Sequence, residues 1–171
     1  MTALLSTVVA FAGLIIVVSS VGADSLGFVL TATLLSFGLA PFAGDSLQQH
    51  IPHSLWERLS LSHTASRRLA LPTFNTLLNH IGWNRLIIAL RDGQSSASIQ
   101  NRRSKNLRPV QAAAAGHTWG FLLHIATAAW AGIAGAWGSA TVLIVMGIIG
   151  HLYPALLQIR VLTRWREHGR S

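Results

Sequence analysis

Three histidines and a glutamine are the side chains best suited to chemistry, because they interrupt two otherwise apolar stretches. His117 and His124 lie in GHTWGFLLHIATAAWAGIAGAW, and His151 and Gln158 lie in ATVLIVMGIIGHLYPALLQIR. Each stretch approaches or exceeds the roughly 20 apolar residues that cross a bilayer. Polar groups at such depth are costly, so they mark a partner, a cavity or a site. We take His124, His151 and Gln158 as a candidate intramembrane polar layer, and His117 as the candidate catalytic residue.

The spacing predicts how these four residues meet. A short turn at residues 138–139 separates the two stretches, so we expect an antiparallel helical hairpin. Counted from this turn, His124 and His151 both lie about 18–20 Å from the outer end of the hairpin. The same count places His117 level with Gln158. We therefore expect two polar layers, with His124 close to His151 in the bundle interior.

Level histidines on facing helices suit more than one chemistry. His124 and His151 could bind a b-type haem through both axial positions. Neutral imidazoles hydrogen-bonded to each other, or to Thr127 and Gln158, explain the same pattern. The chain has no cysteine, which excludes disulfides, thiolate catalysis and Cys-based metal sites. We expect no resident metal or cofactor, with haem b as the alternative.

The composition predicts an integral membrane protein, since 51% of the residues are hydrophobic and only 11% are charged. The expected fold is all-α, with four transmembrane helices and a cytoplasmic segment of amphipathic interfacial helices between helices 2 and 3. Its parts are a first hairpin in residues 1–43, a basic segment in 44–110, a second hairpin in 111–159 and a basic tail in 160–171. We expect residues 1–23 to be retained as an anchor, although their small terminal residues resemble a signal-peptidase site.

The 13 lysines and arginines are unevenly distributed. Nine lie in residues 44–110 and four in 160–171, whereas the turns at residues 24–25 and 138–139 have none. Because cytoplasmic loops collect basic residues, both termini are predicted on the cytoplasmic side of a bacterial plasma (inner) membrane. This arrangement also accounts for the net charge of +8 without nucleic acid as a partner.

The central segment carries two apolar stripes at helical spacing. The first is Phe74, Leu77, Leu78 and Ile81, and the second is Trp83, Leu86, Ile87 and Leu90. Such helices lie in the membrane interface, or they pack against the cytoplasmic ends of the spans. The pattern does not distinguish the two.

A basic run follows these stripes. Together with one arginine of the tail, it is our candidate site for anionic lipid headgroups. Its members are Arg102, Arg103, Lys105, Arg108 and Arg164. The tendency of basic residues to collect in cytoplasmic loops explains the same run without a lipid site.

Small residues recur at a spacing of four in the third span. They are Gly116 and Gly120, then Ala128, Gly132 and Ala136. Because small residues let helices approach closely, this stripe predicts packing against neighbouring helices of this chain or of other membrane protein subunits.

One set of features occurs in a distinctive order. The set is Ile81-Gly82-Trp83, the basic loop, His117, Tyr153-Pro154, Gln158 and Arg164. This order resembles the family of small membrane proteins typified by glycosyl-4,4'-diaponeurosporenoate acyltransferase of carotenoid biosynthesis, over about half of the chain. The resemblance implies acyl transfer to a glycolipid or polyisoprenoid (carotenoid-type) acceptor at the cytoplasmic interface. It further implies that His117 is the base and that Gln158 and Arg164 orient the substrate.

The departures from that pattern argue against the chemistry. The family's glutamate is Ala114 here, its asparagine is His151, and the arginine after the glutamine is Ile159. A Glu–His pair could activate a hydroxyl for acyl transfer, but His117 has no local carboxylate. We therefore interpret the chain as a non-catalytic integral membrane protein, an accessory or structural subunit of a larger complex that binds lipid or isoprenoid. A membrane acyltransferase is the alternative.

Overall fold

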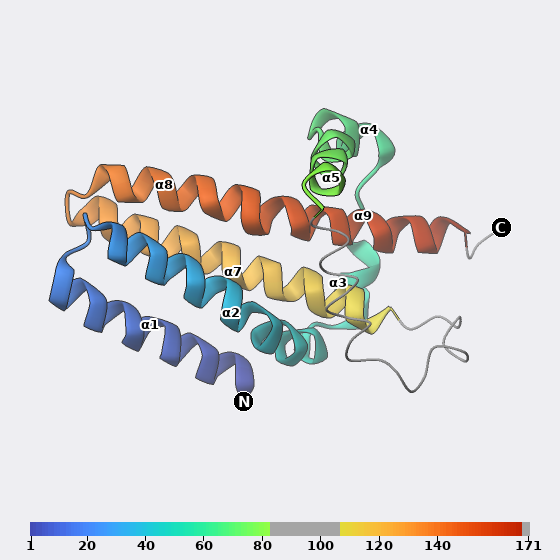
Figure 1. Ribbon diagram of the computed structural model, residues 1–171. Helices are drawn as coiled ribbons and strands as arrows, with labels where there is room; N and C mark the ends of the chain where they lie inside the picture. Colours follow the sequence, from blue (N-terminus) through green and yellow to red (C-terminus); the bar gives the residue numbers. More distant parts are fainter. Residues whose placement is uncertain (83–106, 169–171) are drawn as a thin grey trace.

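The computed structural model describes residues 1–82 and 107–168, and every regular element in these ranges is helical. Four long helical rods lie side by side, each antiparallel to the one before it along the chain (Figure 1). The first three rods are α1 (Thr2–Val21), α2 (Leu26–His50) and α7 (Arg108–Ile133). The fourth is continuous through α8 (Trp137–Gly147), a π-helical turn η2 (Ile148–Leu152) and α9 (Tyr153–His168). The expected all-helical fold is confirmed.

Three of the rods are long and apolar enough to cross a membrane. They are Thr2–Val21, Leu26–His50 and Trp137–Glu167. The molecule is therefore a multi-pass membrane protein by the length and composition of its helices. α7 has 26 residues, but its histidines and threonines make it less apolar than the other three. It packs between α2 and the α8–α9 rod.

The turn of the second hairpin lies earlier than the sequence analysis placed it. α7 ends at Ile133, Gly135 has a φ of 79°, and α8 begins at Trp137. Glycine adopts such a positive φ without the steric cost that a Cβ would bring, so it commonly ends helices. Residues 138–139, which we expected to form the turn, lie in the first turn of α8.

α2 is also longer than the expected second span. It continues through Pro41 to His50, so residues 44–50 extend the span rather than opening the central segment. Gly44 of α2 meets Gly116 of α7 at a contact without side chains: a Cβ built on Gly44 would lie 2.3 Å from the carbonyl oxygen of Ala112. A Cβ on Gly116 would lie 2.5 Å from the carbonyl oxygen of Ala40. The small residues thus bring the two backbones into contact, as expected for Gly116.

The central segment folds into short helices at one end of the bundle: α3 (His53–Arg58), α4 (His63–Arg68) and α5 (Leu71–His80). Trp56 of α3 is buried in an apolar cluster with Ala114, Ala115 and Leu162. α5 is seen nearly end-on in Figure 1, so it runs across the direction of the long rods.

The first apolar stripe is divided between protein and surroundings. Phe74 packs against Tyr153 with ring centroids 4.8 Å apart, whereas Leu77 and Ile81 are 55% and 65% exposed. The stripe therefore packs on the bundle through Phe74 and leaves Leu77 and Ile81 exposed; its place in the membrane interface stays a prediction. The second stripe, Trp83 to Leu90, lies outside the described residues.

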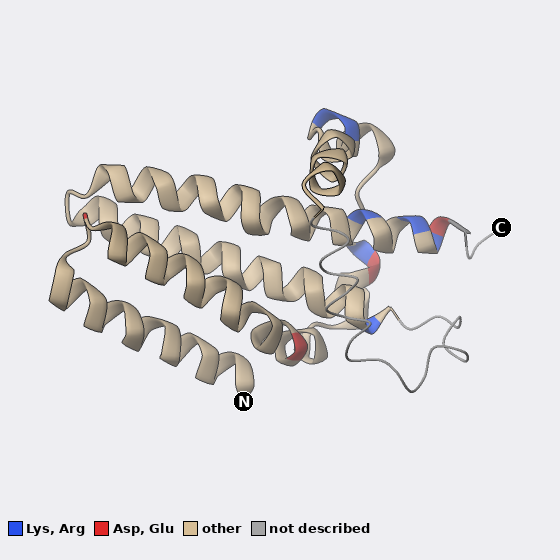
Figure 2. Cartoon of the chain, viewed as in Figure 1, with Lys and Arg blue, Asp and Glu red and all other residues tan. Residues whose placement is uncertain are grey.

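Charged residues gather at the end of the bundle that carries α3–α5, the N-terminus and the end of α9 (Figure 2). At the opposite end, Asp24 is the charged residue found among the described ones. This polarity matches the uneven distribution of basic residues along the sequence.

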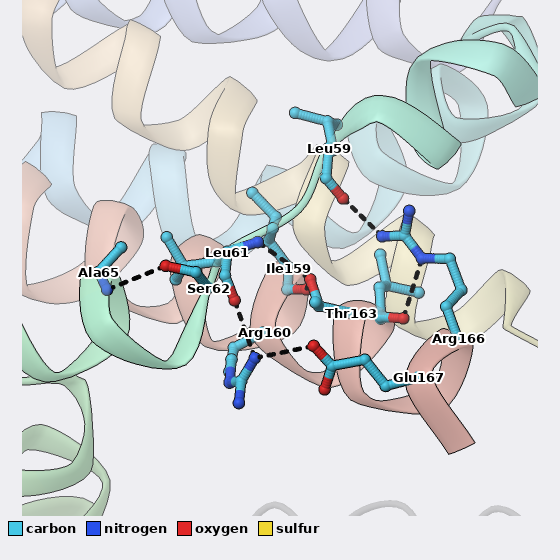
Figure 3. A network of polar contacts seen from close by, with 10 residues as sticks. Leu59, Leu61, Ser62, Ala65, Ile159, Arg160, Thr163, Arg166 and Glu167 are labelled. Carbon is cyan, nitrogen blue, oxygen red and sulfur yellow. Dashed lines mark hydrogen bonds and ion pairs between the residues drawn. The ribbon is translucent and has the colours of Figure 1, made fainter. Parts of the chain in front are cut away.

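Two α9 side chains fasten the link between α3 and α4 to the fourth rod (Figure 3). The Nη1 of Arg160 donates a hydrogen bond of 2.9 Å to the carbonyl of Leu61. The N–H of Leu61 donates one of 3.0 Å to the hydroxyl of Thr163. Arg160 also lies 3.7 Å from a carboxylate oxygen of Glu167.

A second arginine of α9 binds the end of α3 and the same link. Arg166 donates hydrogen bonds to the backbone carbonyls of Glu57 and Leu59. Two basic residues in the C-terminal part of the fourth rod, Arg160 and Arg166, therefore hold the α3–α4 link in place, beyond any part they play in topology.

Candidate functional site

The three candidate histidines come together in one cluster between α2, α7 and the π-helical turn. The Nδ1 atoms of His117 and His151 are 3.3 Å apart. The ring centroid of His151 lies 5.1 Å from that of His124 and 5.4 Å from that of His117. His124 and His151 are fully buried, and His117 is half-buried. The expected proximity of His124 and His151 is confirmed.

Glycines on the facing helices make room for the rings. A Cβ on Gly120 would lie 2.5 Å from the ring of His151, and one on Gly147 would lie 2.8 Å from the Cβ of His124. His151 thus lies opposite Gly120, between His117 and His124 along α7, and contacts both. The expected two layers are wrong in this respect, because His151 joins His117 and His124 in a single layer.

The π-helical turn carries His151 at its fourth position. A π-turn inserts one extra residue into a helix and is frequent at functional sites. The next residues, Tyr153 and Pro154, begin α9. Because Pro154 has no N–H, it removes one donor from the backbone ladder just beyond the turn.

Two residues of α2 complete the cluster and were not candidates from the sequence. The Oγ of Ser36 lies 3.2 Å from the Nε2 of His151, and the ring of Phe37 stacks on that of His151 with centroids 4.4 Å apart. The sequence does not single them out, because a serine in an apolar helix commonly bonds only to its own backbone. Ser36 makes that bond as well, to the carbonyl of Thr33 at 2.8 Å.

His124 has its own partner within α7. Its Nδ1 donates to the carbonyl of Gly120 at 3.0 Å, and its Nε2 is buried without a hydrogen-bond partner in the described structure. Thr127, the partner considered from the sequence, bonds instead to the carbonyls of Leu123 and His124.

The cluster does not fit a haem. A porphyrin ligated by His124 and His151 would have to lie between the two rings, yet these rings are in direct contact and fully buried. Within residues 1–82 and 107–168, no group of three His, Asp or Glu side chains is arranged to hold a metal ion either. The arrangement is that of hydrogen-bonded imidazoles.

The remaining candidates lie away from this cluster or outside the described residues. Gln158 is half-buried on α9, two turns beyond His151. Arg108 and Arg164 are exposed, at the start of α7 and near the end of α9. Arg102, Arg103 and Lys105 lie outside the described residues, so the lipid-headgroup site stays a prediction.

Ala114 stands where the acyltransferase family that the chain resembles has a glutamate, and this position lies in the interface between helices. Ala114 is buried in the apolar cluster around Trp56. Among the described residues, no carboxylate makes a hydrogen bond or ion pair with any histidine of the cluster. The cluster therefore lacks the acidic partner that an acid–base histidine usually has.

An apolar groove opens elsewhere, between α7 and α8 near their turn. Its volume is about 710 Å³. The lining residues are Ile125, Ala128, Ala129, Gly132, Ile133, Trp137, Ala140, Thr141 and Ile144. Two residues of the predicted small-residue stripe, Ala128 and Gly132, thus line this groove, although Ala128 is also buried in the core of the bundle.

Comparison with known proteins finds no relative of this chain. No family model, no curated protein and no solved structure matches it.

Proposed function

We propose that this protein is a non-catalytic, four-span subunit of a larger complex in the bacterial plasma membrane, and that it binds lipid or isoprenoid at its surface. One observation carries the proposal: His117 bonds to His151, His151 bonds to Ser36 and His124 bonds to a backbone carbonyl, and among the described residues none of the three bonds to a carboxylate. Acid–base catalysis by histidine commonly depends on such a partner to orient the ring and stabilise its charged form.

The proposal takes α7 as the fourth span. Its 26 residues extend about 39 Å at 1.5 Å per residue, which exceeds the roughly 30 Å hydrocarbon core. Its most polar deep residues, His124 and Thr127, are fully buried against neighbouring helices and so avoid lipid. With four spans, both termini and the basic central segment lie on the cytoplasmic side.

A partner helix has a suitable surface at the outer end of the second hairpin. Ile133 and Trp137 are 88% and 72% exposed, and the groove that they line is also lined by alanines and a glycine. Small residues on an open helix face allow the close approach that membrane helices use for association.

The test is purification from native membranes in mild detergent, followed by mass spectrometry of bound proteins and lipids. We expect a stoichiometric set of co-purifying subunits. Ala129→Phe, which fills the groove, should release them, whereas Leu122→Phe on an exposed part of α7 outside the groove should not. A protein that purifies alone and at full yield from native membranes contradicts the subunit proposal.

A second candidate is the acyltransferase implied by the resemblance, acting on a glycolipid or polyisoprenoid acceptor. One observation favours it: His117 is half-buried, with its Nδ1 bonded to His151, so its other ring nitrogen faces away from that bond. A general base contributes about 10²–10⁴-fold to a rate. Loss of an acyl-lipid product in His117→Ala membranes, at unchanged protein level, would support this candidate over the first.

If the protein is a non-catalytic subunit, substitutions of His117 should affect only the association of helices. His117→Gln should be nearly silent, and His117→Ala should weaken helix association by about 1–2 kcal/mol. The measurement is the stability of the purified protein together with the lipid profile of the membranes.

A further inference from the structure

The hydrogen bonds of the cluster determine which ring nitrogens carry protons. Ser36 has one hydroxyl proton, and its shorter bond, 2.8 Å, runs to the carbonyl of Thr33, which can only accept. The hydroxyl oxygen is then the acceptor in its 3.2 Å contact with His151. The Nε2 of His151 therefore carries the proton.

The assignment continues from His151 to His117. A charged imidazolium in the bundle interior would lack a counter-ion, so each ring is treated as neutral with a single N–H. Because the Nε2 of His151 is protonated, its Nδ1 has a lone pair. The Nδ1 of His117, 3.3 Å away, must donate to it. The Nε2 of His117 is then left with a lone pair.

The Nε2 atoms of His117 and His124 both carry a lone pair, but their surroundings differ. His124 donates through Nδ1 to Gly120, so its Nε2 also has a lone pair, and that atom is sealed in the core. The hydrogen bond of the His117 ring among the described residues is the one through Nδ1 to His151, and the ring is only half-buried. Only His117 thus offers its lone pair to a molecule outside the bundle.

The depth of His117 in the membrane limits which molecules can reach its Nε2. It lies 16 residues before Ile133, the last residue of α7, which places it about 24 Å from the outer end of the helix. In a hydrocarbon core of roughly 30 Å, this is close to the cytoplasmic boundary. A lone-pair nitrogen needs a donor, and a neutral hydroxyl enters this depth at lower cost than a charged ammonium.

We propose that the Nε2 of His117 is an acceptor site for the hydroxyl group of a membrane-dissolved alcohol, and that His151 and Ser36 act as positioning residues that maintain its lone pair. The alcohol is either an isoprenoid alcohol or the headgroup of a hydroxyl-bearing lipid. The inference rests on the lipid- and isoprenoid-binding part of the proposed function, but not on the partner complex.

The first measurement is the ¹⁵N NMR spectrum of the wild-type protein, labelled at histidine and reconstituted in phosphatidylcholine nanodiscs. We expect the Nδ1 of His117 to be protonated and its Nε2 unprotonated. Addition of geranylgeraniol should shift the Nε2 resonance, and addition of its methyl ether should not. Replacement of phosphatidylcholine by phosphatidylglycerol tests the lipid-headgroup source separately.

The second measurement compares the affinities of the same two ligands in variants. A hydrogen bond of ordinary strength makes the alcohol bind roughly two- to tenfold more tightly than the ether. Ser36→Ala removes the acceptor for His151 and should abolish this preference. The matched control is Ser46→Ala, a buried serine of the same helix that has no bond to the cluster.

Two results overturn the proposal. One is a proton on the Nε2 of His117 in the wild-type spectrum, which does not depend on any variant folding. The other is equal response to alcohol, ether and phosphatidylglycerol. Neither result bears on co-purification of subunits, so failure of this inference is distinct from failure of the subunit proposal.

Discussion

The backbone contact between α2 and α7 makes a quantitative prediction for Gly44→Ala. The new Cβ would lie 2.3 Å from the carbonyl oxygen of Ala112, whereas ordinary van der Waals contact begins at 3.4 Å. The helices must therefore separate locally by about 1 Å, because a backbone carbonyl cannot rotate away as a flexible side chain can. Overpacking of this kind costs about 1–3 kcal/mol.

Gly38→Ala is the matched control on the same helix, because nothing lies within 4 Å of its Cβ position. Both substitutions gain the same helix propensity, up to about 1 kcal/mol. The difference between the two variants thus isolates the clash, and we expect Gly44→Ala to be less stable than Gly38→Ala by about 1–3 kcal/mol.

The assay is reversible unfolding in mixed micelles with increasing SDS, followed by circular dichroism. Gly116→Ala provides an internal check, since its Cβ would meet the carbonyl of Ala40 in the same crossing. One separation of the helices relieves both clashes, so the double variant should lose less stability than the two single losses added together. If Gly44→Ala and Gly38→Ala unfold at the same SDS fraction, the described α2–α7 contact is wrong.

Three further predictions follow from the fold. The chain has no native cysteine, so single cysteines introduced at Ser25 and Gly138 should react with impermeant reagents from outside intact cells. A cysteine at Arg67 should react only after lysis. Labelling of Gly138→Cys from inside alone would refute the four-span topology. Gly120→Ala, whose Cβ would lie 2.5 Å from a buried imidazole, should lower the unfolding midpoint clearly more than Gly138→Ala, which meets nothing within 4 Å. Arg166→Gln removes two hydrogen bonds to the α3–α4 link and should speed its proteolysis several-fold, while Arg67→Gln on exposed α4 should not; equal cleavage would show that the arginine does not hold the link.

The sequence predicted the helices well because their lengths and apolarity are strong local signals. The uneven charge predicted the polarity of the bundle, with Asp24 alone at the opposite end among the described residues. Gly116 was expected at a close helix contact, and it forms one with α2. These features depend on composition and on spacing within one element, and both can be determined directly from the sequence.

The position of the hairpin turn was not predicted correctly. Residues 138–139 contain a glycine and a serine, and they looked like the natural break between two apolar stretches. Gly135 was the better signal, because glycine just past the last helical residue ends many helices. The continuation of α2 through Pro41 was missed for a related reason: in a membrane span, a proline need not end the helix, since neighbouring helices can stabilise the interrupted ladder.

Because the turn lies earlier than expected, the contacts within the candidate site were predicted only in part. His151 pairs with Gly120 instead of the expected His124, a shift of four residues or about one helical turn, and the earlier turn and the extra residue of the π-turn both affect this register. Residues four apart share a face of a helix, so the same polar side chains still point into the bundle. Their partners change, however: His151 faces Gly120, one turn closer to His117 than expected, and Gln158 is left without a histidine at its level. The contact of one histidine with two others therefore depends on the register between the two helices, which no residue spacing within one helix could reveal.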